Sequence, residues 1–411
     1  RQNGVISGLD FCKTTFKLVG KEAVFKPRIK DGRKIKKNKV IAEITAKTKT
    51  ILMAERTALN FLNHASGIST LTNRFVKKVG SKTKICCTRK TIPNLRLFEK
   101  YAVAVGNGTD ALFLSLKALN IGINDEVITT PITFCATSNV VLYQGADIKL
   151  VDIDEKTLNI DPLKIEKAIT PRTKAIIPVD FRGYPANLYQ IYKIAKKYNL
   201  KVIEDGSHSI GSSYKIRNKK YMCGDCSHAD ICTFSFHPVK HITTGEGGVV
   251  LTNDKKIYNK IMKLRKHGVD RRNEMFNKNK RIGNWYYDME DLGYNYRLTD
   301  FQAALGISQL KRLNKFVKRR RQIVNYYNSV FKDIEFIKTY NESQNIRSNY
   351  HLYVISVIKN KFFDRYDLFN YLQRKRFAPM IHYIPIHHLS YYKKKYNFRK
   401  NKFPISDQYY N

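Results

Sequence analysis

From about residue 101 onward, short apolar runs alternate with amphipathic stretches, and this alternation constrains the fold more than any other feature of the chain. The apolar runs have the length of buried strands, whereas stretches such as 189–198 show the helical period. Alternation of this kind predicts a mostly parallel sheet with helices on both faces. The expected strands are 102–105, 126–129, 148–151, 174–179, 201–205, 229–236 and 248–251.

Polar residues of three kinds follow these strands. Gly108-Thr109 opens a helix and would offer free N–H groups to a phosphate. Asp205 ends one strand, and Lys240 lies beyond another. Ligands of open α/β sheets bind at the carboxyl ends of the strands. A Lys and an Asp at that edge are the pair that pyridoxal 5'-phosphate (PLP) needs, one for the Schiff base and one for the pyridine nitrogen. A surface lysine and a helix-capping aspartate are the alternative interpretation, which the pattern alone leaves open.

Four longer sequence motifs decide between these interpretations. Residues 107–112, 202–208, 235–248 and 292–304 resemble the DegT/DnrJ/EryC1/StrS family of sugar aminotransferases. The resemblance implies an α/β fold of the PLP-dependent transferase class (aspartate aminotransferase-like, fold type I). It places the PLP-binding large domain at 101–305 and a small α+β domain, expected to be incomplete, at 306–411.

The resemblance also assigns roles to single residues. Lys240 would bond to the cofactor and shuttle the proton, and Asp205 would pair with the pyridine nitrogen. His208 would lie near the phenolic oxygen of the cofactor. Phe134 would stack on the ring, with an ordinary core aromatic as the alternative. Asn295 would reach the cofactor phosphate of a partner subunit, which implies a homodimer. The phosphate ligands within the chain would be Gly108, Thr109 and Ser235.

Within the family, the chain resembles the transaminases of pseudaminic acid synthesis. This similarity rests on the word 235–248 and on the His- and aromatic-rich stretch 382–392. It implies a UDP-linked 4-keto-6-deoxy amino sugar as substrate, with glutamate as the donor. His382, Tyr383 and His387 would then line the sugar-nucleotide cleft, although the same residues could form a basic, aromatic surface.

The first hundred residues are unlike the rest. The words 3–9, 54–62, 66–72, 88–91 and 97–103 resemble nicotinate-nucleotide pyrophosphorylase (carboxylating), the quinolinate phosphoribosyltransferase of NAD synthesis. The resemblance gives Arg56, Arg89 and Lys90 the task of gripping the quinolinate carboxylates. The later barrel residues of that enzyme have no counterpart here. We therefore expect residues 1–100 to be a truncated α/β-barrel enzyme fragment without activity of its own.

The word 100–103 fits both families, so the chain is expected to be chimeric. Because the aminotransferase part differs from its family at both ends, an inactive chimera and a phosphoribosyltransferase fragment remain alternative functions.

Charge and cysteine content bound the remaining functions. The net charge is +41, from 75 basic and 34 acidic residues spread along the chain. Such a surface suits the diphosphate of a nucleotide sugar, whereas a basic binding protein without catalysis is the competing class. We expect no nucleic-acid partner.

The chain contains no run of about 18 apolar residues, so no membrane span is expected. Seven cysteines and no signal peptide indicate the cytoplasm. The pair Cys223 and Cys226 lacks a second pair for zinc, so no metal is expected.

Overall fold

The computed structural model describes residues 3–59, 62–63, 66, 101–270, 287–361, 363–399 and 401–411. The chain divides into two compact units, Arg1–Lys90 and Thr91–Asn411. The predicted boundary at residue 100 lies outside the described residues, and a division of the second unit at residue 305 stays a prediction.

The described part of the first unit consists of two helices and two antiparallel strand pairs. Helix α1 (Leu9–Val19) and a helix over 48–59 bury their apolar faces in one core, which includes Cys12, Phe16 and Ala54. Strand β1 (Gly4–Val5) pairs with β3 (Lys34–Ile35), and β2 (Val24–Pro27) pairs with β4 (Ala42–Thr45). Strand pairing among these residues is antiparallel throughout, so barrel strands are not represented in them.

The second unit is built on a seven-stranded sheet of order β5-β13-β12-β9-β8-β6-β7. Only β13 runs antiparallel to its neighbours, and the other six strands are parallel to one another. The predicted, mostly parallel sheet is therefore confirmed. The strands span Tyr101–Val105 (β5), Gly248–Thr252 (β13), Ile231–Ser235 (β12), Lys201–Asp205 (β9), Thr173–Ile176 (β8), Glu126–Thr129 (β6) and Asp147–Leu150 (β7).

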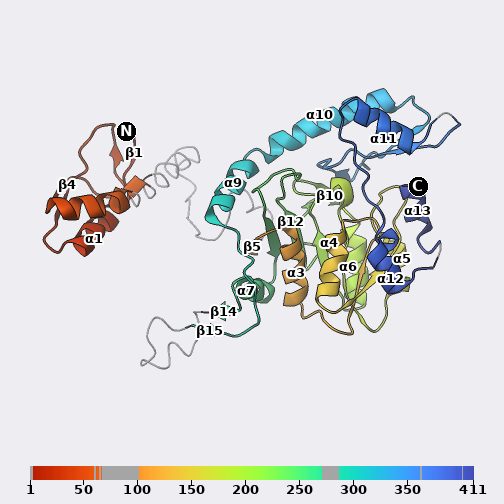
Figure 1. Ribbon diagram of the computed structural model, residues 1–411, viewed down its shortest axis with the longest axis horizontal. Helices are drawn as coiled ribbons and strands as arrows, with labels where there is room; N and C mark the ends of the chain where they lie inside the picture. The colour runs from red at the N-terminus through yellow and green to blue at the C-terminus, as the bar shows by residue number, and fades with distance from the viewer. Residues whose placement is uncertain are drawn as a thin grey trace. The chain divides into compact units, whose positions relative to one another are not determined.

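Helices cover both faces of this sheet, as its apolar strands require (Figure 1). On one face, α3 (Gly108–Ala118), α4 (Cys135–Tyr143) and α7 (Lys255–Leu264) share a core with Val127 and Ile231. On the other face, α5 (Pro162–Ala168) and α6 (Leu188–Lys197) pack on Ile128 and Val202. Consecutive residues of β6 thus enter opposite cores, as the alternation of side chains along a strand dictates.

Past the sheet, α9 (Asp300–Leu310) and α10 (Leu313–Phe331) lead to the remaining small elements (Figure 1). Leu313 and Val317 at the start of α10 share a core with Phe234 of β12, which fixes this helix to the large sheet. The small elements after α10 are β16 (Ile337–Thr339), β17 (Ile346–Arg347), β18 (Ile355–Val357) and α11 (Arg365–Arg374), and those before α9 are η2 (Phe181–Gly183), β10 (Ser213–Ile216), β11 (Lys219–Met222), β14 (Val269–Asp270) and β15 (Asp288–Met289).

The C-terminal elements η3 (Ile386–His388), α12 (Ser390–Tyr396) and α13 (Pro404–Tyr410) return to the large sheet. Ile386 donates its N–H to the carbonyl oxygen of Pro131 (2.9 Å), and Tyr392 and Phe403 enter the core of α3 and α4. This return brings the stretch that begins at His382 to the loop after β6.

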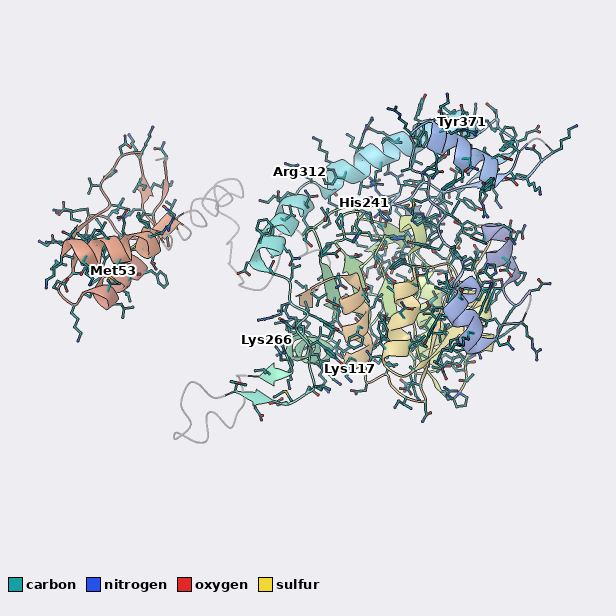
Figure 2. All side chains as sticks on the ribbon, in the orientation of Figure 1. Met53, Lys117, His241, Lys266, Arg312 and Tyr371 are labelled. Atoms are coloured by element: carbon teal, nitrogen blue, oxygen red, sulfur yellow. The ribbon has the colours of Figure 1, made fainter. Side chains whose placement is uncertain are left out.

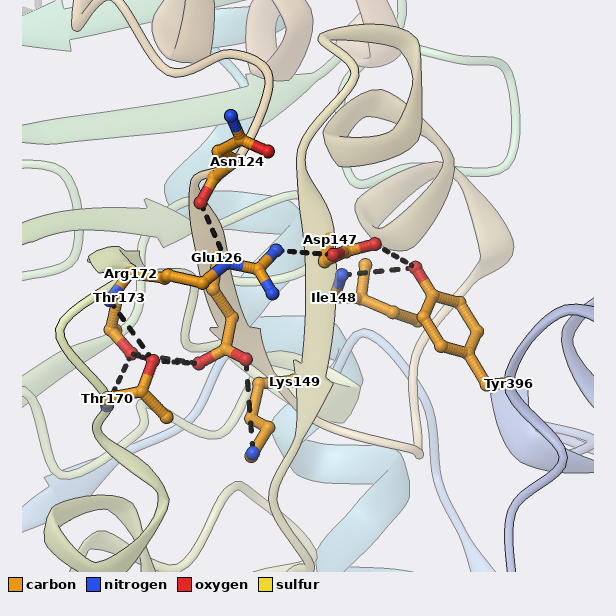
Figure 3. A network of polar contacts seen from close by, with 9 residues as sticks. All are labelled: Asn124, Glu126, Asp147, Ile148, Lys149, Thr170, Arg172, Thr173 and Tyr396. Atoms are coloured by element: carbon orange, nitrogen blue, oxygen red, sulfur yellow. Dashed lines mark hydrogen bonds and ion pairs between the residues drawn. The ribbon is translucent and has the colours of Figure 1, made fainter.

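A polar network fastens the amino-terminal edge of the sheet (Figure 3). Glu126 at the start of β6 accepts a hydrogen bond from the Thr173 hydroxyl (2.9 Å). Arg172 is paired with Asp147 of β7, and the hydroxyl of Tyr396 in α12 donates to the same carboxylate (3.4 Å). The start of β7 and helix α12 are therefore joined at the amino-terminal end of the sheet.

Candidate active site

A cavity of about 890 Å³ lies at the carboxyl ends of the parallel strands. Its walls come from the turn after β5, the loop after β6, the end of β9, the loop after β12 and the segment 380–383. Seven of the predicted residues line it: Gly108, Thr109, Phe134, Asp205, His208, Ser235 and Lys240. The predicted substrate residues His382 and Tyr383 line it too.

The turn into α3 forms a cradle suited to a phosphate. Asn107 caps the helix, and its side chain accepts the N–H of Asp110 (2.8 Å), so the first turn presents its remaining N–H groups to the cavity. Gly108 passes so close to Ser235 that an added Cβ would lie 2.8 Å from the Ser235 Cβ. Only a glycine fits there, and its absent side chain leaves the cradle open. Among the described residues, the Ser235 hydroxyl proton has no acceptor, so it is available to an anion.

Asp110, which the sequence reasoning missed, also lines this cradle. Burial raises the pKa of its carboxyl group to about 6, against the lowering effect of the Asn107 hydrogen bonds. The pKa of Asp110 is thus close to neutral pH, and the negative charge of a nearby phosphate would favour the protonated carboxyl group.

The carboxylate of Asp205 is the most firmly held polar group of the cavity. It is buried at the end of β9 and accepts three hydrogen bonds. Its Oδ2 accepts the Thr137 hydroxyl (2.8 Å), and its Oδ1 accepts the hydroxyl (2.6 Å) and the N–H (3.2 Å) of Ser207. These donors fix the orientation of the carboxylate, as a partner for a protonated ring nitrogen requires.

Lys240 lies in the loop after β12 and faces the same cavity. Burial lowers the pKa of its amino group from 10.5 to about 8, and the charge of Asp205 opposes this fall. A lysine with a pKa near 8 has a useful neutral fraction at physiological pH, which makes it a nucleophile toward an aldehyde.

Neutral histidines make up the wall opposite the cradle. The Tyr383 hydroxyl lies 3.3 Å from Nε2 of His208, and the two rings stack with centroids 6.3 Å apart. His351, which the sequence reasoning missed, lies against His208 with ring centroids 4.4 Å apart. Burial lowers the pKa of His208 well below its usual value and that of His351 to about 2. His241, labelled in Figure 2, is buried behind them, and its Nε2 lies 3.0 Å from the carbonyl oxygen of Asn349.

Phe134 stands at the mouth of the cavity with 58% of its surface exposed. Its ring centroid lies 6.2 Å from that of Tyr383 at an angle of 50°. An exposed aromatic ring in this position is not a core residue, and it offers a face to a planar ligand.

Other predicted residues lie elsewhere. His387 does not line the cavity, because it is buried against α13 with its Nε2 2.7 Å from Asp407 Oδ1. Asn295 does not line it either, and its side-chain oxygen accepts the Nε–H of Arg297 (3.0 Å). Thr299, not Asn295, caps the nearby helix α9 through a capping box with Gln302. Arg56 is exposed on the helix over 48–59, whereas Arg89 and Lys90 lie outside the described residues.

These features fit PLP. The cavity combines a cradle that a Cβ would fill at Gly108, an orientated carboxylate at Asp205 and a neutralisable amine at Lys240. Phosphate, ring nitrogen and aldehyde are the three groups by which PLP is bound.

No helix of the described ranges is both long and apolar enough to cross a bilayer.

Comparison with known proteins agrees with this geometry. The family model for the quinolinate phosphoribosyl transferase N-terminal domain matches residues 1–66, a shorter stretch than the predicted resemblance over 1–103. The spore coat polysaccharide biosynthesis protein SpsC of Bacillus subtilis is 41% identical over 313 residues, covering 76% of this chain and 78% of SpsC. A UDP-4-amino-4,6-dideoxy-N-acetyl-beta-L-altrosamine transaminase of Campylobacter jejuni is 38% identical over 299 residues, covering 72% of this chain and 74% of that enzyme.

Solved structures give the same answer. Helicobacter pylori PseC, an aminotransferase involved in the biosynthesis of pseudoaminic acid, has a TM-score of 0.68 and 31% identity, and the match covers 82% of this chain and 88% of PseC. The PLP form of the sugar aminotransferase Spr1654 from Streptococcus pneumoniae has a TM-score of 0.68 and 27% identity, over 83% and 88% of the two chains. The DegT/DnrJ/EryC1/StrS aminotransferase family model matches residues 96–411. The chain therefore belongs to the DegT/DnrJ/EryC1/StrS aminotransferase family, a family of PLP-dependent enzymes.

Proposed function

We propose that this protein transfers an amino group from glutamate to a UDP-linked 4-keto-6-deoxy amino sugar, with PLP as cofactor. The observation that carries the proposal is the meeting of Lys240, Asp205 and His208 on the walls of one cavity. A lysine at this position can bond to the cofactor aldehyde, which favours transamination.

Lys240 does the proton chemistry. With a pKa of about 8, about a quarter of its amino groups are neutral at pH 7.5, compared with about one in a thousand for an ordinary lysine. With PLP bound, the neutral Nζ would hold the cofactor through its aldehyde, with loss of water, and would take the proton from the α-carbon of the donor. The same Nζ returns a proton to the sugar carbon that receives nitrogen. When bound, PLP would supply the electron sink for these proton transfers.

The other residues hold and orient. Asp205, fixed by Thr137 and Ser207, would keep the ring nitrogen of the cofactor protonated. His208 lies beside Tyr383 on the cavity wall, and it would contact the phenolic oxygen of the cofactor. Because burial keeps the His208 imidazole neutral by lowering its pKa, it can share a hydrogen bond there without adding a charge.

The substrate class follows from the relatives and from the outer wall. The Campylobacter transaminase is named for a UDP-linked amino sugar, and PseC is an aminotransferase involved in pseudoaminic acid biosynthesis. In this chain His382, Tyr383 and His351 give the cavity wall polar and aromatic groups that suit sugar hydroxyls. The basic character of the chain suits the diphosphate.

We further propose that the enzyme acts as a homodimer in the cytoplasm. Asn295 does not line the cavity of its own subunit, which is compatible with a role at the cofactor phosphate of a partner. Among the described residues the cysteines form no disulfide bond, as expected in a reducing compartment.

A spectroscopic comparison tests the proposal. The purified chain, mixed with PLP, should develop the near-visible absorbance band of a lysine-bound cofactor. Lys240→Ala should lack the band, whereas Lys255→Ala, at an exposed lysine on α7, should keep it. Glutamate should then discharge the band in the wild type. A wild type without the band, or a Lys240→Ala variant that retains it, would contradict the proposal.

A further inference from the structure

Two acidic side chains, Glu204 and Asp180, are buried near the end of β9, the strand that carries Asp205. Glu204 precedes Asp205 on β9, and because successive side chains of a strand point to opposite faces, it points away from the cavity. Asp180 lies in the loop after β8. Glu204 is 1% exposed and Asp180 is 0% exposed, and the proposed mechanism uses neither.

The two carboxyl groups lie close to each other. One oxygen from each and the Sγ atom of Cys223 lie within 4.8 Å of one another. Asp180 accepts the N–H of Ala186 (2.8 Å) and the hydroxyl of Ser209 (2.6 Å). Glu204 Oε2 accepts the N–H of Gly224 (3.2 Å), whereas its Oε1 is buried and has no donor.

Among the described residues, no cationic side chain compensates this pair. Neither carboxylate takes part in an ion pair with Lys, Arg or His in that part of the chain. The titratable groups that face the pair are the thiols of Cys223 and Cys232 and the phenol of Tyr214. Burial raises the pKa of all three, so they too are neutral. Two carboxylate charges in such a site are strongly disfavoured, and one proton shared between them removes the repulsion.

We propose that Glu204 is protonated and donates its carboxyl proton to Asp180, and that this pair positions the turn 205–209 that carries Asp205 and His208. This proposal rests on the proposed function, because positioning matters only if Asp205 serves the cofactor.

The backbone explains how the pair reaches the turn. Asp180 donates its N–H to the carbonyl oxygen of Asp205 (3.1 Å), and Asp205 donates its N–H to that of Pro178 (2.9 Å). The side chain of Asp180 holds Ser209 at the other end of the turn. Asp180 is thus hydrogen-bonded to both ends of the turn, at Asp205 and at Ser209. The hydrogen bond from Glu204 would fix the position of the Asp180 carboxylate.

Infrared spectroscopy of the full chain tests the shared proton without reference to PLP. The wild type at pH 8 should show the C=O band of a buried protonated carboxyl group, with a small shift in heavy water. Glu204→Gln should lose this band. Glu126→Gln, at the other buried glutamate of the sheet, should keep it, because Glu126 accepts from two threonines (2.9 and 3.2 Å) and lies 3.9 Å from Lys149.

Absence of the band in the wild type, or its persistence in Glu204→Gln, would overturn the shared proton. One equivalent of tightly bound metal in place of the band would overturn it as well, since a cation would then compensate the pair.

Equilibrium PLP titration tests the positioning. The amide group introduced by Glu204→Gln can donate to Asp180 as the acid does, so this variant should bind PLP within about threefold of the wild type. Glu204→Ala leaves Asp180 without this donor, and its PLP dissociation constant should rise about tenfold or more. Equal affinity in Glu204→Ala and the wild type would refute positioning. Failure of the wild type itself to bind PLP would instead refute the proposed function, while the infrared band would still decide the shared proton.

Discussion

The reactivity of Lys240 follows from two opposing effects that can be separated experimentally. Burial lowers the pKa of its amino group from 10.5 to about 8, and the Asp205 carboxylate raises it. A fall of this size increases the neutral fraction at pH 7 about 300-fold. Replacing Asp205 by Asn removes the raising effect and leaves the burial, so the pKa of Lys240 should fall further.

The assay is the initial rate at which the cofactor-free chain combines with PLP, followed by absorbance across neutral and alkaline pH. The Lys240→Ala variant supplies the background from other lysines. In the wild type the rate specific to Lys240 should rise with pH and level off above its pKa of about 8. In Asp205→Asn the midpoint should move to lower pH, even though the final complex is weaker. A wild-type midpoint near that of an ordinary lysine, or a midpoint raised by Asp205→Asn, would refute the reasoning.

Three further predictions concern other parts of the chain. Asn295→Ala should weaken PLP binding by about 1–3 kcal/mol, or about tenfold to a hundredfold, and make it depend on protein concentration; unchanged affinity in a dimeric variant would exclude the cross-subunit role. Asp407→Ala removes the acceptor that lies 2.7 and 2.8 Å from the Nε2 atoms of His387 and His388, and should lower the free energy of unfolding by about 1–3 kcal/mol in a denaturant titration, whereas a loss below about 0.5 kcal/mol would count against this clasp. The chain should form no nicotinate mononucleotide from quinolinate and phosphoribosyl diphosphate, and chromatographic detection of that product would contradict the expectation for residues 1–100.

The layout of the sheet could be predicted because buried parallel strands are short apolar runs. The runs at 126–129 and 201–205 match β6 and β9 to the residue. The run at 174–179 was predicted too long, since the β8 ladder ends at Ile176 and Pro178 has no N–H to donate. Asp230, which lies inside the run 229–236, uses its carboxylate to accept the Val202 N–H (3.0 Å), and β12 begins only after it.

The residues of the candidate site also fall into those that a local pattern predicts and those that it does not. Residues at the ends of strands, such as Asp205 and Lys240, could be placed at one edge because the carboxyl ends of parallel strands meet there. His351 could not, because its contact with His208 joins distant parts of the chain and no local pattern encodes it. His387 was assigned to the cleft for its polar, aromatic neighbourhood, yet its partner Asp407 in α13 holds it away from the cavity. Glu204 and Asp180 also come together from different strand ends, so the sequence around Glu204 shows only its place beside Asp205.

The central claim is that Lys240 mediates amino transfer from glutamate to a UDP-linked 4-keto sugar. The most direct measurement gives the PLP-loaded chain nitrogen-labelled glutamate and this sugar nucleotide, and follows the label by mass spectrometry. The account predicts a labelled UDP-amino sugar and 2-oxoglutarate in equal amounts with the wild type and Lys255→Ala, and neither product with Lys240→Ala. Unlabelled sugar with the wild type, or labelled product with Lys240→Ala, would contradict it.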